Sequence, residues 1–395
     1  MRHKIVIACD SFKGCLRSEE VASAVAEGIG IVVPDAEVVK MPIADGGEGT
    51  GRILTEIMGG ETIYVEVSDP LGRKITAEYG IILSDSNPEQ NKTAVIEMAQ
   101  ASGLTLLAKD EKNPLMTSTY GTGEMILDAI DKGCRKILVG IGGSATNDGG
   151  TGMLEALGYR FLDSEGNPIH GCCGGRLGEI SKIDESLVES KIRGTEFIVA
   201  CDVNTPFCGE NGASKVFAPQ KGADKDIVDL LETGMQSLDK IIFKQYGIDM
   251  SAIPGSGAAG GLGGAFKAVL NAELKSGIDL ILDAAGFDTM IEDASLVVTG
   301  EGHIDSQSSQ GKVIDGILKR CKRQNIPVMA IGGIVDDENC VDTKDGSHLS
   351  KAFAICPEPQ NESDLEYAMR PEVAYQNISC SVSKALRELS PFLFL

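Results

Sequence analysis

Several features are scarce in this 395-residue sequence, and each scarcity excludes some classes of function. It has no tryptophan, 5% aromatic residues and only four histidines, so histidine-based catalytic sites have few candidates. Lysine and arginine number 36 against 58 aspartates and glutamates, which gives a formal net charge of −22. This balance argues against nucleic acid or an anionic membrane as the main partner, because both require a basic face. The acidic composition is still compatible with small phosphate ligands, since these need only a few backbone amides and lysines.

Membrane and secretion features are also missing. No run of about 18 apolar residues is present, so the sequence predicts no transmembrane helix. The first apolar stretch reaches Asp10 too soon for the core of a signal peptide. The eleven cysteines are irregularly spaced, and Cys9 and Cys201 lie in apolar strand-like runs. This pattern predicts free thiols in a reducing cytoplasm rather than a secreted disulfide scaffold.

Apolar strand-like runs alternate with helical patterns along almost the whole chain. This alternation predicts an α/β fold with a largely parallel sheet. The turn sequence DPLG between two such runs predicts an antiparallel hairpin. The expected strands are residues 4–9, 37–41, 63–67, 74–82, 93–98, 136–141, 197–201, 296–299 and 328–331. The expected helices lie near residues 18–28, 51–58, 123–132, 152–157, 225–246, 264–275 and 312–323.

The length predicts two domains at roughly 150 residues each, with three as an upper bound. The two ends of the chain share one pattern, an apolar strand, an acid-bearing loop and then a helix. We therefore expect a Rossmann- or flavodoxin-like α/β domain built from residues 1–60 and 285–395. A mixed α/β domain would be inserted at residues 61–284, with the active site in the cleft between the two domains.

Glycine is abundant, with 48 residues that arrive in clusters, and five glycine-rich or acid-bearing loops follow expected strands. Ligands of α/β proteins bind outside the carboxyl ends of the strands, where glycine lets backbone amides approach an anion. A carboxylate beside a phosphate repels it unless Mg²⁺ lies between them or the acid handles a proton. The alternative is that these glycines only make tight turns and the acids only cap helices. The loops are residues 10–14, 44–51, 140–152, 255–264 and 299–305.

Three charged residues in or near these loops have two interpretations each. Asp148, in the string NDGG, fits either a helix cap or a metal-binding elbow. Lys221, in APQKGADK, fits a phosphate or carboxylate contact and equally a surface lysine. Lys312 fits a ligand contact or a solvated helix residue.

Three other motifs are incomplete or lie in the wrong sequence context. No P-loop is present, because Gly311-Lys312 is followed by Val313 instead of serine or threonine. The string from Gly255 to Gly260 matches GxGxxG, but MSAIP precedes it rather than a strand, which weakens a dinucleotide interpretation. Residues 170–173 (HGCC) lack the spacing and the second ligand pair of a zinc site.

Eight long and specific strings, taken in order, make the chain resemble the bacterial two-domain glycerate kinases that form 2-phosphoglycerate. The resemblance runs from residue 4 to about residue 335, and it implies ATP, Mg²⁺ and D-glycerate bound between two α/β domains. The chain departs from the family pattern at His303, where arginine is usual, and at residues 205–207, where NPL is usual. The histidine would weaken one cationic contact. The strings are DSFKG, PIADGGEGT, AVIEMAQASGL, NPLMTSTYGTGE, GIGGSATNDGGTGML, VFAPQKGA, GAAGGLGGA and TGEGHIDSQSSQGK.

Phosphoryl transfer requires in-line positioning, neutralisation of the γ-phosphate and help in removing the acceptor proton. We expect Asp305 to be the base, with Asp148 near it and with Lys13 and Lys312 offsetting anionic charge. The expected metal ligands are Asp202 and Glu301. The expected substrate and nucleotide contacts are Ser11, Asp45, Glu48, Gly142, Gly143, Ser144, Lys221, Gly260, Gly261 and His303.

The predicted function is the Mg²⁺- and ATP-dependent phosphorylation of D-glycerate in the cytoplasm, with small molecules as the partners and oligomeric state left open. Only the resemblance favours the 2-hydroxyl, so the 3-hydroxyl or a related small hydroxy acid stays an alternative. An NAD-dependent oxidoreductase is disfavoured by the absent strand before Gly255. A non-catalytic nucleotide-binding regulator is disfavoured because buried acids are costly without a metal or a proton to handle.

Overall fold

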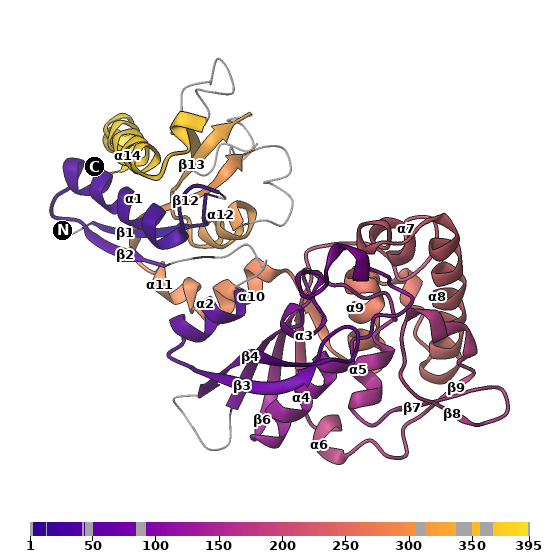
Figure 1. Cartoon of the computed structure of the whole chain (residues 1–395). Coiled ribbons are helices and arrows are strands. Elements are labelled where there is room, and N and C mark those ends of the chain that lie inside the picture. The colour runs from indigo at the N-terminus through magenta and orange to yellow at the C-terminus, as the bar shows by residue number, and fades with distance from the viewer. Residues whose placement is uncertain are drawn as a thin grey trace. The chain divides into compact units, whose positions relative to one another are not determined.

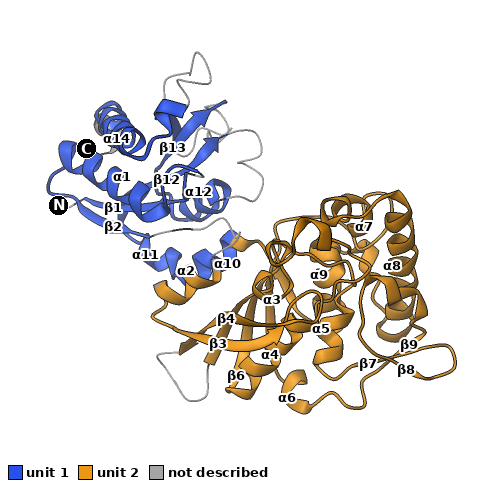
Figure 2. Ribbon diagram, in the orientation of Figure 1, with its two compact units in different colours: residues 1–45, 278–395 blue, residues 46–277 orange. Residues whose placement is uncertain are grey.

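The structure is a computed structural model that describes residues 3–12, 14–41, 43, 50–83, 92–304, 313–336, 350–355 and 366–393 (Figure 1). The chain divides into two compact units (Figure 2). The terminal unit combines residues 1–45 and 278–395, and the inserted unit comprises residues 46–277. Each unit has its own sheet, so the two are described separately.

Five parallel strands form the sheet of the terminal unit. They are β1 (Lys4–Cys9), β2 (Glu37–Lys40), β12 (Ala294–Ile304), β13 (Val328–Val335) and β14 (Ser350–Ala354). The spatial order β14-β13-β12-β1-β2 corresponds to 2-1-3-4-5 when the five strands are numbered along the chain. This is the flavodoxin-like order, in which the order reverses between β1 and β12.

Helices cover both faces of this sheet, which explains why β1 is apolar at nearly every position. On one face Met329 and Ile331 pack with residues of α1 (Ser18–Val32) and α14 (Pro371–Leu393). On the other face Ala330, one residue out of phase, packs with α12 (Val313–Gln324). Short helices of this unit include α10 (Gly277–Ala284), which starts at the boundary, and α11 (Phe287–Met290).

Two glycines of α1 give a matched test of its packing on α14. A Cβ on Gly28 would lie 2.5 Å from the carbonyl oxygen of Ser379, whereas a Cβ on Gly30 meets nothing within 4 Å. We therefore expect Gly28→Ala to lower the free energy of unfolding by about 1–3 kcal/mol through overpacking. Gly30→Ala should raise it by about 0.5–1 kcal/mol, because alanine is the better helix former. Urea denaturation of both variants tests this, and shifts in the same direction would contradict the close helix contact.

The inserted unit is built on a six-stranded mixed sheet in the order β11-β10-β6-β5-β4-β3. The first four strands in that order are parallel to one another, and β3 and β4 form an antiparallel hairpin beside β5. At the hairpin turn the Asp69 carboxylate accepts hydrogen bonds from the backbone amides of Leu71 and Arg73, as the DPLG string predicts. The strands are β3 (Glu61–Ser68), β4 (Lys74–Leu83), β5 (Lys92–Glu97), β6 (Cys134–Gly140), β10 (Glu196–Ala200) and β11 (Glu273–Lys275).

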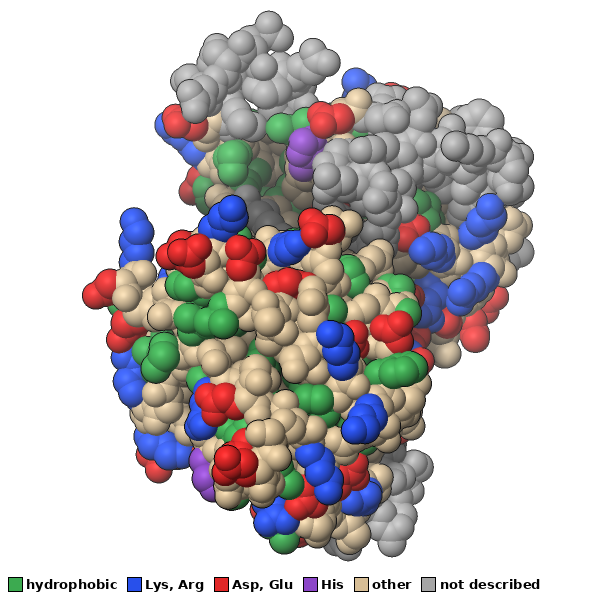
Figure 3. Space-filling model, turned by 90° about the vertical axis from the view of Figure 1, so that its right-hand side faces the viewer, with side chains coloured by type: hydrophobic (Ala, Val, Ile, Leu, Met, Phe, Trp, Pro, Cys, Tyr) green, Lys and Arg blue, Asp and Glu red, His purple; other side chains and the backbone are tan. Residues whose placement is uncertain are grey.

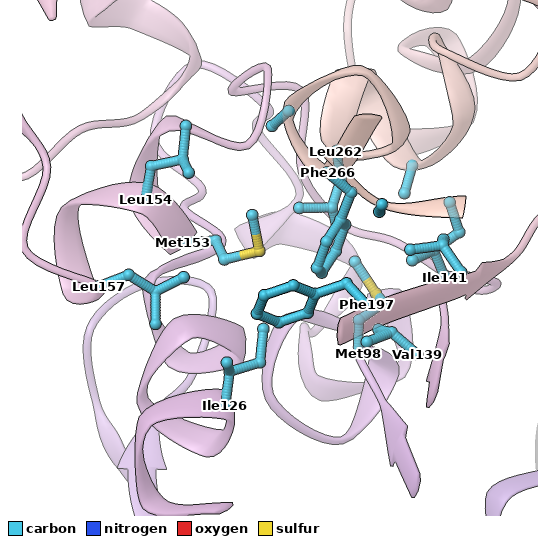
Figure 4. Packing of buried hydrophobic residues seen from close by; sticks show 14 of the residues in the cluster. Met98, Ile126, Val139, Ile141, Met153, Leu154, Leu157, Phe197, Leu262 and Phe266 are labelled. Atoms are coloured by element: carbon cyan, nitrogen blue, oxygen red, sulfur yellow. The ribbon is translucent and has the colours of Figure 1, made fainter. Parts of the chain in front are cut away.

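The core of the inserted unit lies between this sheet and the helices packed on it, and Figure 4 shows part of it. Phe197 of β10 and Phe266 of α9 have ring centroids 5.9 Å apart, and Met153 of α5 and Ile126 of α4 belong to the same cluster. The helices of the unit are α2 (Thr50–Ile57), α3 (Ala99–Ser102), α4 (Tyr120–Asp131), α5 (Thr151–Ala156), α6 (Ser190–Arg193), α7 (Ala213–Phe217), α8 (Lys225–Tyr246) and α9 (Ala258–Ala268). A small antiparallel sheet adds β7 (Arg160–Leu162), β8 (Pro168–Ile169) and β9 (Lys182–Asp184).

Two sequence-based expectations about local structure are wrong, and one small sheet was not expected. The expected helix at 264–275 ends early, because α9 (Ala258–Ala268) is followed by β11 at Glu273–Lys275, and three left-handed residues at 259–261 interrupt α9. Residues 299–304 are not a loop, because pairing with β13 carries β12 past the end of β1 to Ile304. The small β7–β9 sheet was not expected at all.

Three further observations concern membrane spans, surface charge and thiols. In the described part of the chain, no helix combines the length and hydrophobicity needed to span a membrane. Figure 3 shows acidic and basic side chains interspersed over one face of the molecule. The described cysteines are all free thiols.

Candidate active site

The loop between β6 and α5, residues 141–150, is the centre of the candidate site in the inserted unit. It leaves the carboxyl end of a parallel strand, the position at which α/β sheets bind ligands. Gly142 and Gly143 are exposed and Ser144 is half-buried, whereas every residue from 145 to 150 is buried. The exposed turn is held from behind, because Leu104 donates its amide to the Gly143 carbonyl at 2.8 Å. Two glycine backbones and one hydroxyl therefore lie together at the carboxyl end of β6.

Asp148 is the buried anchor of that loop. Its side chain has no exposed surface, and one carboxylate oxygen accepts from the amide and the hydroxyl of Thr119 at 2.8 and 2.7 Å. The amides of Gly150 and Gly152 donate to the same carboxylate at 3.1 and 3.2 Å. Burial raises the pKa of Asp148, and these hydrogen bonds oppose the increase. The two Thr119 donors tie the loop to the start of α4, and the amides of Gly150 and Gly152 lie at the start of α5, so the helix-cap interpretation matches the geometry.

Lys221 lies inside the protein. Only 2% of it is exposed, and its ammonium donates to the Ser144 hydroxyl oxygen and the Thr146 carbonyl oxygen, each at 2.7 Å. Burial lowers the pKa of Lys221 to about 7, while the charge of Asp148 acts in the opposite direction. The surface-lysine interpretation is therefore wrong. The side chain supports the loop from behind, and its ammonium does not reach solvent.

Lys221 gives a pH-dependent prediction for stability. An unfolded lysine has a pKa of about 10.4, so between about pH 7 and pH 10 the unfolded state binds more protons than the folded state. The free energy of unfolding of the wild type should therefore rise with pH across that window, relative to Lys221→Met. Below about pH 7 the wild type carries the full cost of burying the charge, and K221M should be the more stable protein. Denaturant titrations across this range test it, with exposed Lys225→Met as control, and parallel pH profiles for wild type and K221M would contradict it.

Gly260 and Gly261 are buried packing residues. With Ala259 they form three successive left-handed residues that interrupt α9. The Gly260 carbonyl accepts from the amide of Gly149 at 3.0 Å, and the Gly261 amide donates to the carbonyl of Gly257. The two glycine-rich strings thus pack against each other, and the Gly261 amide that the sequence suggested for an anion is already used.

Glu97 is a residue that the sequence analysis passed over. It ends β5, the neighbour of β6, and its carboxylate accepts from the Gly51 amide in the first turn of α2 at 2.6 Å. Glu97 also lines a polar cavity of about 220 Å³ together with Arg52, Glu78 and Gln100. The string AVIEMAQASGL contained this acid at a strand end, which is the feature that would have selected it.

Asp202 follows β10, and its carboxylate accepts from the Gly277 amide at 2.7 Å, where α10 begins. Among the residues that the structure describes, no three histidines, cysteines, aspartates or glutamates converge into a metal site. Asp202 and Glu301 also belong to different units, so neither unit by itself brings the two expected metal ligands together.

In the terminal unit the candidate residues gather where β1 ends beside β12, at the reversal of strand order. The Asp10 amide donates to the Gly300 carbonyl at 2.9 Å, and the Asp10 carboxylate accepts from the Ser11 amide at 2.6 Å. Glu301 is buried on β12. His303, further along β12, lies 2.8 Å from the carboxylate of Asp336. His303 is thus paired with an acid that the sequence analysis did not single out.

Five of the expected site residues lie outside the described residues. They are Lys13, Asp45, Glu48, Asp305 and Lys312.

Comparison with known proteins then classifies the chain. A model of the glycerate kinase family matches residues 5–388. The chain belongs to the glycerate kinase family. The resemblance inferred from the sequence strings is thereby confirmed, and the protein is a kinase.

Individual glycerate kinases agree over nearly their full lengths. The glycerate 2-kinase of Escherichia coli is 44% identical over 335 residues, which cover 85% of this chain and 86% of that protein. The glycerate kinase of Halalkalibacterium halodurans is 43% identical over 374 residues, covering 93% and 96%. A crystal structure assigned to glycerate kinase 2 of Salmonella typhimurium LT2 superposes with a TM-score of 0.82 at 39% identity and covers both chains completely. The α/β fold class is confirmed by this match.

Proposed function

We propose that this glycerate kinase transfers the γ-phosphoryl group of MgATP to the 2-hydroxyl of D-glycerate, giving 2-phosphoglycerate and ADP. The observation that supports it most is the exposed Gly142–Ser144 turn at the carboxyl end of β6, with the buried Lys221 ammonium behind it. Backbone amides and a nearby cation are what a phosphate or carboxylate group needs. The relative from Escherichia coli named glycerate 2-kinase supports the 2-position.

In the proposed mechanism the glycerate hydroxyl attacks the γ-phosphorus in line with the departing ADP. A bond forms between the substrate oxygen and phosphorus, the bond from phosphorus to the bridging oxygen of ADP breaks, and the hydroxyl proton passes to a carboxylate. Asp305 is our candidate for that base, with Lys13 and Lys312 offsetting anionic charge. Ser11, Asp45, Glu48 and His303 are the candidate contacts from the other loops.

Mg²⁺ enters with the nucleotide as part of the substrate, bound chiefly by the phosphate oxygens, and neutralises charge on the transferred group. Asp202 and Glu301 are the proposed carboxylates nearest to it. Asp148 takes a positioning role in this scheme, because four hydrogen bonds already occupy its carboxylate. We propose closure of the two units around the substrates as the step that excludes water.

A reducing cytoplasm is the compartment that the described free thiols fit, and we propose that the enzyme acts there. Its partners are then small molecules, MgATP and D-glycerate.

A coupled assay tests the function. Purified protein is supplied with MgATP and D-glycerate, together with enolase and pyruvate kinase but without phosphoglycerate mutase. Immediate turnover means that 2-phosphoglycerate is the product. Turnover only after mutase is added would place the phosphate on the 3-hydroxyl, and no turnover in either case would contradict glycerate as the acceptor. Asp305→Asn in the same assay should reduce kcat by at least about a hundredfold if Asp305 is the base.

A further inference from the structure

The Ser144 hydroxyl lies between a buried cation and the exposed turn. Lys221 Nζ is 2.7 Å from Ser144 Oγ on one side, and Ser144 itself is half-exposed beside Gly142 and Gly143. Lys221 is almost fully buried, so its ammonium can act on a ligand at this turn only through another group. Ser144 is the group in direct contact with both the ammonium and the surface.

Hydrogen-bond chemistry fixes the direction of this contact. An ammonium has three donor hydrogens and no acceptor, so Ser144 Oγ must accept from Lys221. The one hydrogen of the serine hydroxyl is then left to donate elsewhere. Within the described residues, no protein acceptor receives it, and Ser144 is itself partly exposed next to the two exposed glycines. This hydrogen is therefore available to a ligand bound at the neighbouring Gly142–Gly143 turn.

We propose that Ser144 is an oriented hydrogen-bond donor for an oxyanion bound at the Gly142–Gly143 turn, and that Lys221 is the positioning residue that orients it. The ligand class is a phosphate or carboxylate oxygen, from the phosphate chain of the nucleotide or from glycerate. This inference rests on the proposed function, because it assigns one of that reaction's anions to this turn.

The charges around Lys221 fit this role. Asp148 is the carboxylate whose charge acts on Lys221, but its own oxygens are occupied by Thr119, Gly150 and Gly152. The other contact of the ammonium is the neutral carbonyl of Thr146. On the far side of the lysine turn, Gly222 packs against the backbone of Lys112, a second cation. Among the described residues, no carboxylate is in hydrogen-bond contact with the ammonium, so its contacts are the Ser144 hydroxyl and the Thr146 carbonyl alone.

Burial also makes the arrangement sensitive to pH. Because the pKa of Lys221 lies at about 7, the amine is largely neutral at about pH 8.5. A neutral amine has a lone pair, so it accepts the serine hydrogen that the ammonium had left free. Ser144 then stops being an obligatory outward donor, and its contribution to anion binding falls as pH rises.

Calorimetric titration of the full chain tests the proposal, with D-glycerate and ADP as separate ligands. The proteins are wild type, Ser144→Ala, Lys221→Met, the double variant and the exposed control Lys225→Met. At about pH 6 we expect S144A to weaken binding of one of the two ligands by about tenfold or more, the effect of losing a charge-assisted hydrogen bond. K221M should weaken the same ligand, and adding K221M to S144A should change the Kd less than about twofold, because the two side chains act as one unit.

The pH comparison separates this role from a merely structural one. The ratio of the Kd of S144A to that of wild type should fall from about tenfold at pH 6 to about twofold at pH 8.5. Ionisation of the ligand cancels in this ratio, because both proteins bind the same ligand. Ser144→Thr keeps the hydroxyl and should retain the wild-type Kd and its pH dependence.

The ligand whose Kd responds identifies the anion as phosphate or carboxylate. If S144A and K221M leave both Kd values within about twofold of wild type, or if their effects are additive and independent of pH, the proposal is overturned. The coupled assay tests the proposed function separately. If S144A and K221M both turn over glycerate at the wild-type rate, the proposed function stands and the role proposed for Ser144 and Lys221 is wrong. Thermal melts of each variant exclude loss of fold as the cause.

Discussion

Replacing Asp148 by alanine is expected to lower the free energy of unfolding by about 3–5 kcal/mol and to abolish turnover. The change leaves the amide and hydroxyl of Thr119 and the amides of Gly150 and Gly152 without their buried acceptor. Each unsatisfied buried donor costs about 1–3 kcal/mol, partly offset because a buried charge is also removed. The measurement is urea denaturation together with the coupled assay.

Asp148→Asn separates charge from hydrogen bonding at the same position. The one amide oxygen of asparagine can keep the hydrogen bonds from Thr119 and Gly152, but the NH₂ group then faces the Gly150 amide, and neither of these two donors can accept. We expect a loss of about 2 kcal/mol or more, whereas the exposed Asp131→Asn should stay within about 0.5 kcal/mol of wild type. Wild-type stability in D148N would mean that the anchor is not held by these contacts.

Gly260→Ala is the second substitution with a large expected effect. Gly260 has φ +67°, and a Cβ there would lie 2.0 Å from the carbonyl oxygen of Thr146 and 2.6 Å from the Cα of Asn147. The left-handed conformation costs alanine about 1–2 kcal/mol, and overpacking adds about 1–3 kcal/mol. We expect a total loss of about 4 kcal/mol of unfolding free energy.

Gly178→Ala is the matched control, because a Cβ at that glycine meets nothing within 4 Å and its φ is not positive. Its stability should stay within about 0.5 kcal/mol of wild type. Denaturation curves for the two variants decide the point. If G260A were as stable as G178A, the close contact between the two glycine-rich strings would be wrong.

The sequence predicted correctly those elements whose first and last residues carry their own capping or turn signals. The helix expected at residues 225–246 is α8, because Asp224 caps its first turn by accepting from the Ile227 amide and Gly247 ends it in a left-handed conformation. The Asp69–Gly72 hairpin turn was found for the same reason, since an aspartate and a glycine occupy the positions such a turn needs.

Elements set by distant contacts were missed or misplaced. Residues 258–268 have poor intrinsic helix propensity, and α9 forms because it is buried, with Gly264 close against Phe207. The extension of β12 through Glu301 to Ile304 depends on pairing with β13, about 30 residues later in the chain. No local pattern contains either contact.

The same division applies to the site. Sequence reasoning found the 140–152 loop and Asp148 from glycine and acid spacing. It could not show that Lys221, 75 residues from Thr146, folds underneath that loop. Burial of a lysine is a property of the tertiary structure, whereas composition favours exposure for this residue type.

The insertion of one unit inside the other has a consequence during synthesis. Strand β1 is made among the first residues, but its neighbour β12 pairs with it from about 290 residues later. At about 5–20 residues per second, a ribosome needs roughly 15–60 s to supply that partner. During that time the inserted unit emerges as one continuous stretch. The apolar strand β1, which lies inside its sheet in the finished protein, has not yet paired with β12. We therefore expect the first-made segment to complete its fold last and to be the part of the nascent chain that most needs a chaperone.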